Sequence, residues 1–344
     1  MAAEEVQERL TRFLQQGCSS PLSARLGWHK DPNGDVHWIE VSPQRGSEPL
    51  QYGGRVFVRR GRSSVTPTPV ELQELYNIFG HVLTEERVIQ DAGASDVGTD
   101  AFHKFLQRQG LDTDTAPQPS GTDDLRNRHV LADLGGELHP TLYGILAFGK
   151  HPQKHPQTRN FVVDCVAYGG EDRASDVLLV SKVAGRMDEL VKRSVDWFSS
   201  LGRLELYRGL IREARHLLPL KALRESLVNA VAHRDYAITG SKILLEVFAQ
   251  HVDVTSPGGL PNPMSVESVR AGGLPRSRNE WMAHYMVEMG LMEQRGRGWP
   301  IMRKEMRQFN GTEPDITQGE DGAFVRVRFR MGVPESSGLD MVSG

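Results

Sequence analysis

The chain has 344 residues, of which 38% are hydrophobic and 25% charged, and its formal net charge is −3. This size and apolar content predict roughly two or three domains with buried cores. The small negative charge excludes a global attraction for nucleic acid, and no apolar run is long enough to span a membrane as a helix. Two cysteines are too few for a disulfide framework or a cysteine zinc site. Because the first residues lack a basic start and an apolar signal core, we expect a cytoplasmic protein.

The N-terminal part predicts one short helix followed by strands. Residues 4–16 have the pattern of an amphipathic helix, and Asn33-Gly34 predicts a hairpin turn between Trp28 and Trp38. A strand is expected at residues 54–60. Four arginines lie on and after it, namely Arg55, Arg59, Arg60 and Arg62. They could contact DNA or RNA phosphates in a salt-dependent way, or they could be a solvated edge whose charge discourages aggregation.

The middle of the chain predicts a helical connector and a loop. Pro67-Thr-Pro precedes a helix near residues 70–79, and further helices are expected at 84–110. The composition of residues 111–121 is typical of a flexible loop. Helices and strands alternate from about 125 to 215, with a strand at 160–166, and the last residues predict a loose tail.

A near match to a phosphate-binding loop occurs at Gly144-Ile-Leu-Ala-Phe-Gly-Lys-His. Gly144, Gly149 and Lys150 are in register with Gly-x-x-x-x-Gly-Lys-[Ser/Thr], but His151 replaces the hydroxyl residue that would bind magnesium. The four residues between the glycines are apolar and suit a buried element. Pro152 then interrupts the helix that a phosphate would need. We therefore expect no phosphate-binding loop here. Without such a loop, the sequence has no strong support for a helicase motor.

The segment from Leu223 to Tyr236 is the most informative in the chain. At 100° per residue, leucines 220, 223 and 227 and Val231 fall on one side of a helix. Glu225, Asn229 and His233 form a stripe on the opposite side. Glutamate and asparagine one turn apart can serve a nucleotide as a base for water and as a neutral oxygen ligand for magnesium. The same stripe could be only the solvated face of an amphipathic helix.

Two glycine-rich turns follow this helix. A strand is expected at residues 242–250, and Pro257 with Gly258 and Gly259 then forms a turn where backbone can approach a ligand closely. Gly296 and Gly298 precede a predicted helix at 300–306. Glycines in that position offer unpaired N–H groups and a positive helix end to a phosphate.

Two polar pairs near these turns have two interpretations each. His233 and Arg234 could reach phosphate at the end of the 223–236 helix, or they could cap its C-terminus. Arg278 and Asn279 lie in a polar loop. An arginine there could meet the γ-phosphate of a nucleotide, or it could form a surface salt bridge.

The order of helix, strand, glycine turn, Gly-x-Gly and helix resembles the ATP-binding domain of the gyrase, heat-shock chaperone, histidine kinase and mismatch-repair superfamily (GHKL). The segments Ala222–Tyr236, Ser256–Pro261 and Arg278-Asn279 resemble more narrowly a bacterial and archaeal branch. That branch joins a Schlafen AlbA-type domain to a GHKL ATPase domain, and its members are often labelled transcriptional regulators or RecG-related helicases. Residues 56–64 are similar to the end of the AlbA-type domain, whose front half has no counterpart before residue 30.

This resemblance implies an α+β fold: a GHKL (Bergerat-type) sandwich of mixed sheet and helices behind a partial AlbA-type α/β domain and a helical connector. The expected boundaries are residues 1–65 for the AlbA-type part, 66–125 for the connector and loop, 126–332 for the ATP-binding domain and 333–344 for the tail. ATP and Mg²⁺ are the implied cofactors, and a homodimer the implied assembly.

Carried over residue by residue, the resemblance makes Glu225 the general base and Asn229 the Mg²⁺ ligand. Gly258 and Gly259 would line the adenine end, and Gly296 and Gly298 would meet the phosphates, with His233, Arg278 and Asn279 nearby. Most of the superfamily has an Asp at the start of the first glycine turn that binds the adenine amino group. Ser256 occupies that position here. Asp253, three residues earlier, is either its substitute or a solvated residue at the strand end.

Two classes of function follow. The first is an ATP-binding regulator, acting on DNA or transcription, that is capable of slow Mg²⁺-dependent hydrolysis. The alternative is a degenerate, non-hydrolysing scaffold or interaction protein, or the ATPase subunit of a nucleic-acid processing or defence system. The partners expected are ATP and DNA or RNA, without a membrane.

Overall fold

The computed structural model describes residues 3–332 except 20–23, 33, 42–48, 69–70, 73–74, 77–83, 111–121, 209–210, 262–263, 273–275 and 293–295. The chain divides into two compact units, Met1–Val82 and Leu83–Gly344. The division falls inside the segment expected to connect the domains. Most of the helix predicted at 70–79, the loop at 111–121 and the tail lie outside the described residues.

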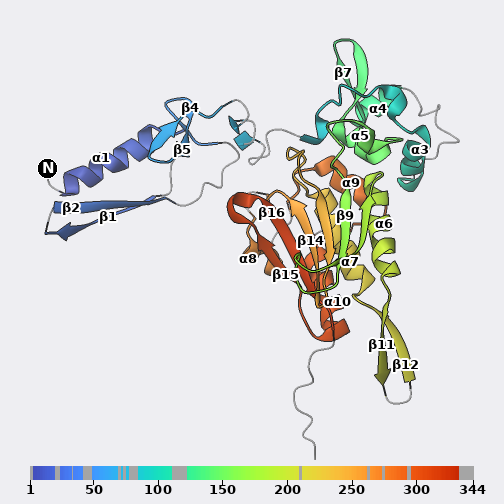
Figure 1. The fold of residues 1–344 in the computed structure, drawn as a ribbon. Coiled ribbons are helices and arrows are strands. Elements are labelled where there is room, and N and C mark those ends of the chain that lie inside the picture. Colours follow the sequence, from blue (N-terminus) through green and yellow to red (C-terminus); the bar gives the residue numbers. More distant parts are fainter. Residues whose placement is uncertain are drawn as a thin grey trace, which may run out of the picture. The chain divides into compact units, whose positions relative to one another are not determined.

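The first unit contains a helix and short hairpins (Figure 1). The helix expected at 4–16 is α1 (Ala3–Gln16), and the expected hairpin pairs β1 (Ala24–Asp31) with β2 (Gly34–Val41) in antiparallel register. Gly34 has φ 137°, which suits the turn that Asn33-Gly34 predicts. Two smaller pairs follow: β3 (Gln51–Tyr52) with β4 (Arg55–Val56), and β5 (Val58–Arg60) with β6 (Ser63–Val65).

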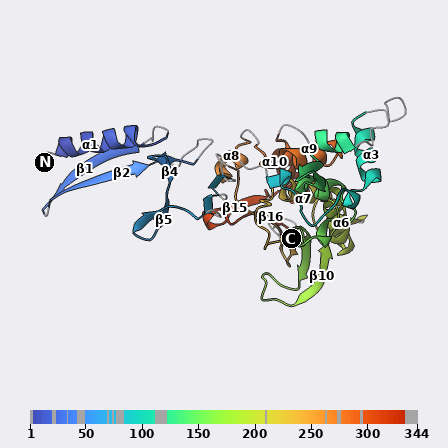
Figure 2. The ribbon, with the colours of Figure 1, turned by 90° about the horizontal axis from the view of Figure 1, so that it is seen from above.

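A six-stranded mixed sheet forms the centre of the second unit, in the order β10-β9-β13-β14-β16-β15. The strands are β9 (Val163–Tyr168), β10 (Val177–Val183), β13 (Ile243–Val247), β14 (His251–Pro257), β15 (Asp315–Gln318) and β16 (Phe324–Arg330). β9 and β13 run parallel, and the other neighbours are antiparallel. β10 lies at one edge (Figure 2). The mixed α+β fold expected from the sequence is thus present.

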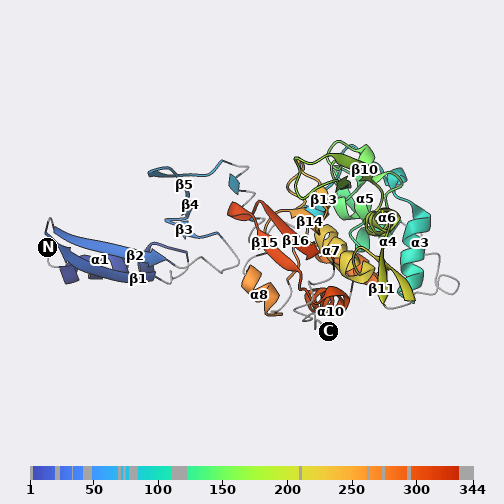
Figure 3. The ribbon, with the colours of Figure 1, turned by 60° about the horizontal axis from the view of Figure 1, so that its bottom comes forward.

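Helices cover one face of this sheet. α6 (Met187–Ser200) packs on β9 and β10, α7 (Leu220–Ala232) packs on β14, and α10 (Gly298–Asn310) packs along α7. Figure 3 shows α7 next to β14, with α10 close to α7. Side chains alternate between the two faces of a strand. Consequently the neighbouring Leu245 and Val254 point to the helices and are buried in the core.

The opposite face of the sheet is polar. Glu246 and Asp253 are neighbours on β13 and β14, and each carboxylate binds an arginine through two hydrogen bonds. Arg173 donates to Glu246 at 2.6 and 2.6 Å, and Arg328 donates to Asp253 at 2.7 and 2.7 Å. Bidentate pairs of this kind satisfy carboxylates that are only 3% exposed.

The remaining elements of the second unit lie outside this sheet and these three helices. They are η1 (Thr84–Glu86), η2 (Ala94–Asp96), α3 (Thr99–Arg108), α4 (Thr122–Asn127), β7 (Leu131–Leu134), β8 (Glu137–Pro140), α5 (Leu142–Phe148), η3 (Pro152–Lys154), β11 (Arg203–Arg208), β12 (Ile211–His216), α8 (Val266–Arg270), α9 (Glu280–Glu288) and η4 (Glu320–Gly322). None of the helices in the described part of the chain combines the length and apolar content needed to cross a membrane.

The near match to a phosphate-binding loop forms buried α5. Thr141 caps this helix by accepting a hydrogen bond from the Gly144 N–H at 2.9 Å, and residues 142–148 are all buried. A Cβ atom on Gly144 would lie 2.1 Å from the Val130 carbonyl oxygen. Close packing against a neighbouring backbone therefore explains this glycine without any ligand.

Gly144→Ala is expected to lower the free energy of unfolding by about 1 to 3 kcal/mol, because the added methyl overpacks the core. The Val130 oxygen cannot easily retreat, since it accepts the Thr141 N–H at 3.0 Å. Urea unfolding would measure the loss. Gly93→Ala is the matched control, because a Cβ there meets nothing closer than 3.8 Å. Equal stability of the two variants would contradict the packing explanation.

Candidate functional site

A cavity of about 480 Å³ lies in the second unit between α7, the helix-covered face of the sheet and the start of α10. Small-molecule sites commonly have volumes of about 300–1,000 Å³ and mostly apolar walls with a few placed polar groups. The apolar wall here includes Val254, Leu260, Met264, Val287, Met292, Trp299, Met302, Ile316, Val325 and Val327. Its composition suits an organic group such as a flat heterocycle.

The polar stripe of α7 supplies one wall. Glu225, Asn229 and His233 all line the cavity, because the opposite side of α7 is anchored in the core by Leu223, Leu227 and Val231, each 0% exposed. Glu225 is 2% exposed, and the Arg224 guanidinium lies 3.8 Å from its carboxylate. The Asn229 amide has no hydrogen-bond partner among the described residues. The stripe thus places a carboxylate beside an uncommitted amide.

The first glycine turn forms the rim beside the sheet. β14 ends at Pro257, and Gly258 follows with φ 92°, a conformation that favours glycine. A Cβ on Gly258 would lie 2.3 Å from the Asp235 Cβ, and one on Gly259 would lie 2.9 Å from the Gly322 Cα. Both glycines line the cavity, so the turn brings bare backbone to its edge.

The second pair of glycines brings the start of α10 to the carboxylate and amide of α7. Gly296 and Gly298 line the cavity. A Cβ on Gly298 would lie 3.1 Å from the Asn229 Nδ2 and 3.4 Å from the Glu225 Oε2. The first N–H groups of a helix have no partner within that helix and favour an anion. Cavity, uncommitted amide and helix start therefore fit a phosphate-bearing ligand with its cation.

Ser256 and Asp253 lie on opposite faces of β14. Ser256 lines the cavity, and its hydroxyl donates to the Ala230 carbonyl oxygen at 2.9 Å. Asp253 lies on the polar face, where it binds Arg328. Three residues along a strand reverse the direction of a side chain. The structure therefore does not bring Asp253 to the cavity that Ser256 lines.

Arg278 and Asn279 do not line the cavity and instead hold its surroundings together. Arg278 donates to the Asp235 carboxylate at 2.7 Å and to the Gly259 carbonyl oxygen. Asn279 is 1% exposed, and its amide donates to the Ala232 and Arg234 carbonyl oxygens at 3.0 and 2.8 Å. These side chains hold the glycine turn and the end of α7 in place, and their contact with a ligand stays a prediction.

Arg234 has a structural role. Its guanidinium is buried and donates to the carbonyl oxygens of Asp235, Ile238 and Ser241, each at 2.6 Å. It also lies 4.4 Å from the Phe161 ring centroid and 5.1 Å from that of Tyr236. Of the two interpretations of His233-Arg234, stabilisation of the helix end applies to Arg234, whereas His233 lines the cavity.

His233 is held neutral at the cavity wall. Burial, with a smaller contribution from the nearby positive charge of Arg278, lowers the pKa of His233 from 6.5 to about 4. Its Nδ1 lies 3.3 Å from the Ser277 hydroxyl oxygen. At neutral pH the imidazole therefore offers hydrogen-bonding atoms without a positive charge.

The free energy of unfolding is expected to fall by up to about 3 kcal/mol as the pH drops from 6.5 to 4. In that window the unfolded histidine binds a proton while the folded one does not, so protonation favours the unfolded chain. Urea unfolding at several pH values would show this slope in the wild type and a flatter one in His233→Gln. All other histidines are common to both proteins. Identical pH dependence in the two would contradict the lowered pKa.

The four arginines predicted to contact nucleic acid belong to the first unit and are exposed. Arg60 is partly neutralised, since it donates to the Glu71 carboxylate at 2.7 and 2.8 Å. Arg59 donates to the Gly61 carbonyl oxygen and the Ser64 hydroxyl. Contact of Arg55, Arg59, Arg60 and Arg62 with DNA or RNA stays a prediction.

Sequence reasoning missed the apolar side of the cavity. Trp299 and Met302 come from α10, while Ile316 and Val325 come from the last two strands. Their apolar periodicity is the same as that of any core-facing residue, so no sequence signal distinguishes a cavity wall from packed core.

Comparison with known proteins supports a nucleotide-related domain. Residues 240–329 match the family model described as "Putative ATP-dependent DNA helicase recG C-terminal". The match includes both glycine turns and begins after the α7 stripe. This segment is therefore similar to an ATPase-like family, whereas the AlbA-type domain is not shown. No protein of curated function matches the sequence.

A solved structure is similar in fold. It is the DIP2311 protein from Corynebacterium diphtheriae, with a TM-score of 0.55 and 18% identity over 92% of this chain. The chain covers 61% of the length of that protein. At this identity the similarity shows a common fold alone. The chain is thus a mixed α+β protein whose residues 240–329 resemble an ATPase-like family.

Proposed function

We propose that the second unit binds ATP with Mg²⁺ in the cavity beneath α7, as in GHKL domains. The observation that carries the proposal is the position of Gly298. A Cβ on this residue would lie within 3.4 Å of both the Asn229 amide and the Glu225 carboxylate. A helix start, an uncommitted amide oxygen and a carboxylate at one point suit a triphosphate and its magnesium ion.

The purine would occupy the apolar part of the cavity near Gly258 and Gly259. Ser256 lies there in place of the usual Asp, and its proton is already donated to Ala230. The serine oxygen can accept a hydrogen bond from an adenine amino group but binds it less strongly than a carboxylate. We therefore expect modest selectivity for adenine.

Magnesium would be bound through the Asn229 oxygen and the phosphates. Mg²⁺ sites at nucleotides commonly use one or two protein ligands with phosphate oxygens and water. The described residues contain no cluster of three or more His, Cys, Asp or Glu side chains that could hold a metal without a nucleotide. The bound ion would neutralise phosphate charge and supply electrostatic stabilisation during hydrolysis.

Glu225 is the proposed base for water. Its carboxylate is 2% exposed and lines the cavity near the start of α10. Glu225→Gln keeps the size of the side chain and removes its basicity. We expect phosphate release from ATP to fall by about 100-fold or more, while calorimetry shows ATP binding within about threefold of the wild type. Release equal to the wild type would exclude Glu225 as the base.

We further propose that the nucleotide state regulates binding to DNA. This part rests on the resemblance to transcriptional regulators and on the family match. The homodimer expected from the resemblance stays a prediction. If ATP does not bind, the alternative function, a non-hydrolysing interaction protein, is favoured.

A further inference from the structure

Residues 150–154 and 184–193 enclose a second cavity, of about 520 Å³, that no part of the proposed ATP site uses. Lys150 and His151 follow α5, Lys154 ends η3, and Arg193 lies in the middle of α6. The two cavities have no lining residue in common. Lys150 and His151 are the end of the near match to a phosphate-binding loop.

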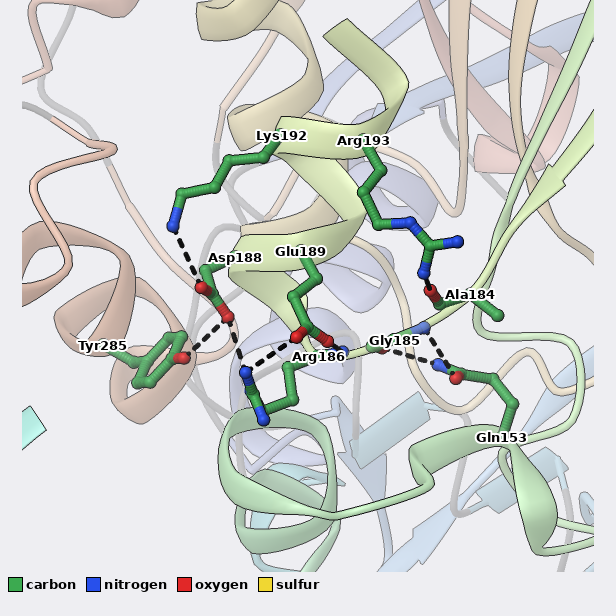
Figure 4. Close-up of polar contacts among 9 residues, drawn as sticks. All are labelled: Gln153, Ala184, Gly185, Arg186, Asp188, Glu189, Lys192, Arg193 and Tyr285. Atoms are coloured by element: carbon green, nitrogen blue, oxygen red, sulfur yellow. Dashed lines mark hydrogen bonds and ion pairs between the residues drawn. The ribbon is translucent and has the colours of Figure 1, made fainter. Parts of the chain in front are cut away.

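The walls of this cavity are held by hydrogen bonds between the Gln153 side chain and backbone groups. The Gln153 amide donates to the Gly185 carbonyl oxygen and accepts the Gly185 N–H, both at 2.9 Å (Figure 4). It also donates to the Phe161 carbonyl oxygen at 2.9 Å. Gly185 has φ 137°, a backbone conformation that would be strained in a residue with a side chain. The two segments are therefore joined before any ligand arrives.

The cations around the cavity differ in whether a carboxylate pairs with them. Arg186 binds Glu189 at 2.7 Å, and Lys192 binds Asp188 at 3.1 Å (Figure 4). Lys150 donates to the Ser95 carbonyl oxygen at 2.8 Å, and Arg193 donates to the Ala184 carbonyl oxygen at 2.5 Å. Within the described chain, no carboxylate pairs with Lys150, Lys154 or Arg193.

The cavity consequently carries an excess of positive charge. Three permanently charged side chains line it against one carboxylate, that of Glu189, which Arg186 already uses. Unpaired cations that converge on one hollow attract an anion. Lysine and arginine together are typical of phosphate contacts.

We propose that this cavity binds phosphates of a nucleic-acid strand. Lys150, His151, Lys154 and Arg193 are exposed, and no Phe, Tyr or Trp side chain lines the cavity. A free nucleotide would need an enclosed apolar surface for its base. A nucleic-acid strand can bind through its backbone phosphates alone, while its bases stay outside the cavity. The identity of the ligand rests on the proposed DNA-linked function, whereas the site itself is independent of ATP binding at α7.

Fluorescence anisotropy with a labelled single strand and a labelled duplex, in a salt series, tests the proposal on the full chain. Lys154→Glu is expected to weaken binding by about tenfold regardless of base sequence and to reduce the salt slope by about 1. Lys304→Glu makes the same charge change at an exposed lysine of α10 that lines neither cavity. That control should bind nearly as the wild type does.

The proposal is overturned if Lys154→Glu binds as tightly as the wild type, or if Lys304→Glu loses as much affinity. It is equally overturned if the wild type binds neither DNA, or if only inorganic phosphate binds at this site in calorimetry. ATP calorimetry on Lys154→Glu separates the two sites, since ATP affinity should be unchanged. Loss of ATP binding in the wild type would contradict the proposed function and leave this phosphate site standing.

Discussion

Asn229→Ala is expected to lose Mg²⁺-dependent ATP binding, with an affinity reduced by at least about 100-fold. The Asn229 amide oxygen is the proposed protein ligand of the ion. Alanine has no side-chain oxygen that could replace it. Calorimetry with Mg²⁺ would measure the loss. Because the Asn229 amide makes no hydrogen bond among the described residues, the folded protein should be as stable as the wild type. An unchanged affinity for Mg-ATP would remove Asn229 from the site.

Arg234→Ala is expected to lower the free energy of unfolding by about 3 kcal/mol or more. Three buried carbonyl oxygens would lose their donor, and each unsatisfied group costs about 1 to 3 kcal/mol. Loss of the contacts with Phe161 and Tyr236 adds to this. Relief from burying a charge offsets part of the loss, since burial lowers the pKa of Arg234 to about 10.

Urea unfolding measures this effect, and Arg307→Ala is the matched control. Arg307 pairs with Glu313 on the surface, where such pairs contribute about 1 kcal/mol or less. The two variants remove the same side chain from a buried and an exposed position. If Arg234→Ala stayed within about 1 kcal/mol of the control, its three carbonyl contacts would not stabilise the fold.

Helical periodicity was sufficient to predict the α7 stripe. Glu225, Asn229 and His233 recur every four residues, and the apolar side of the same helix had to be buried, so the stripe could only face outward to the cavity. The glycine turns were equally predictable from their local sequence, and a Cβ would clash at Gly258 and make a tight contact at Gly298. Sequence patterns with a fixed local period carry this information without the tertiary structure.

The position of Asp253 away from the cavity has a simple cause. Asp253 and Ser256 are separated by an odd number of residues on one strand, so they cannot face the same side. Strand parity would have excluded the substitution. The role of Arg234 was beyond such reasoning, because it depends on Phe161 and on carbonyl groups that only tertiary packing brings together.

The second cavity shows the same limit. Lys154 and Arg193 are ordinary surface residues in sequence, and they meet only because Gln153 joins the two segments at Gly185. The near match to a phosphate-binding loop includes Lys150, but the glycines of that motif are needed for close packing of α5 and not for phosphate binding. Contacts between distant segments, rather than local patterns, determine which charges remain unpaired.

Calorimetric titration of the wild-type chain with ATP, with Mg²⁺ and with EDTA, tests the central claim most directly. We expect one ATP per chain, bound clearly more tightly with Mg²⁺ than without, because the ion would join the phosphates to Asn229. No binding heat under either condition, at concentrations where the chain is folded, would contradict it. The second unit would then have the fold of an ATP-binding domain without binding nucleotide.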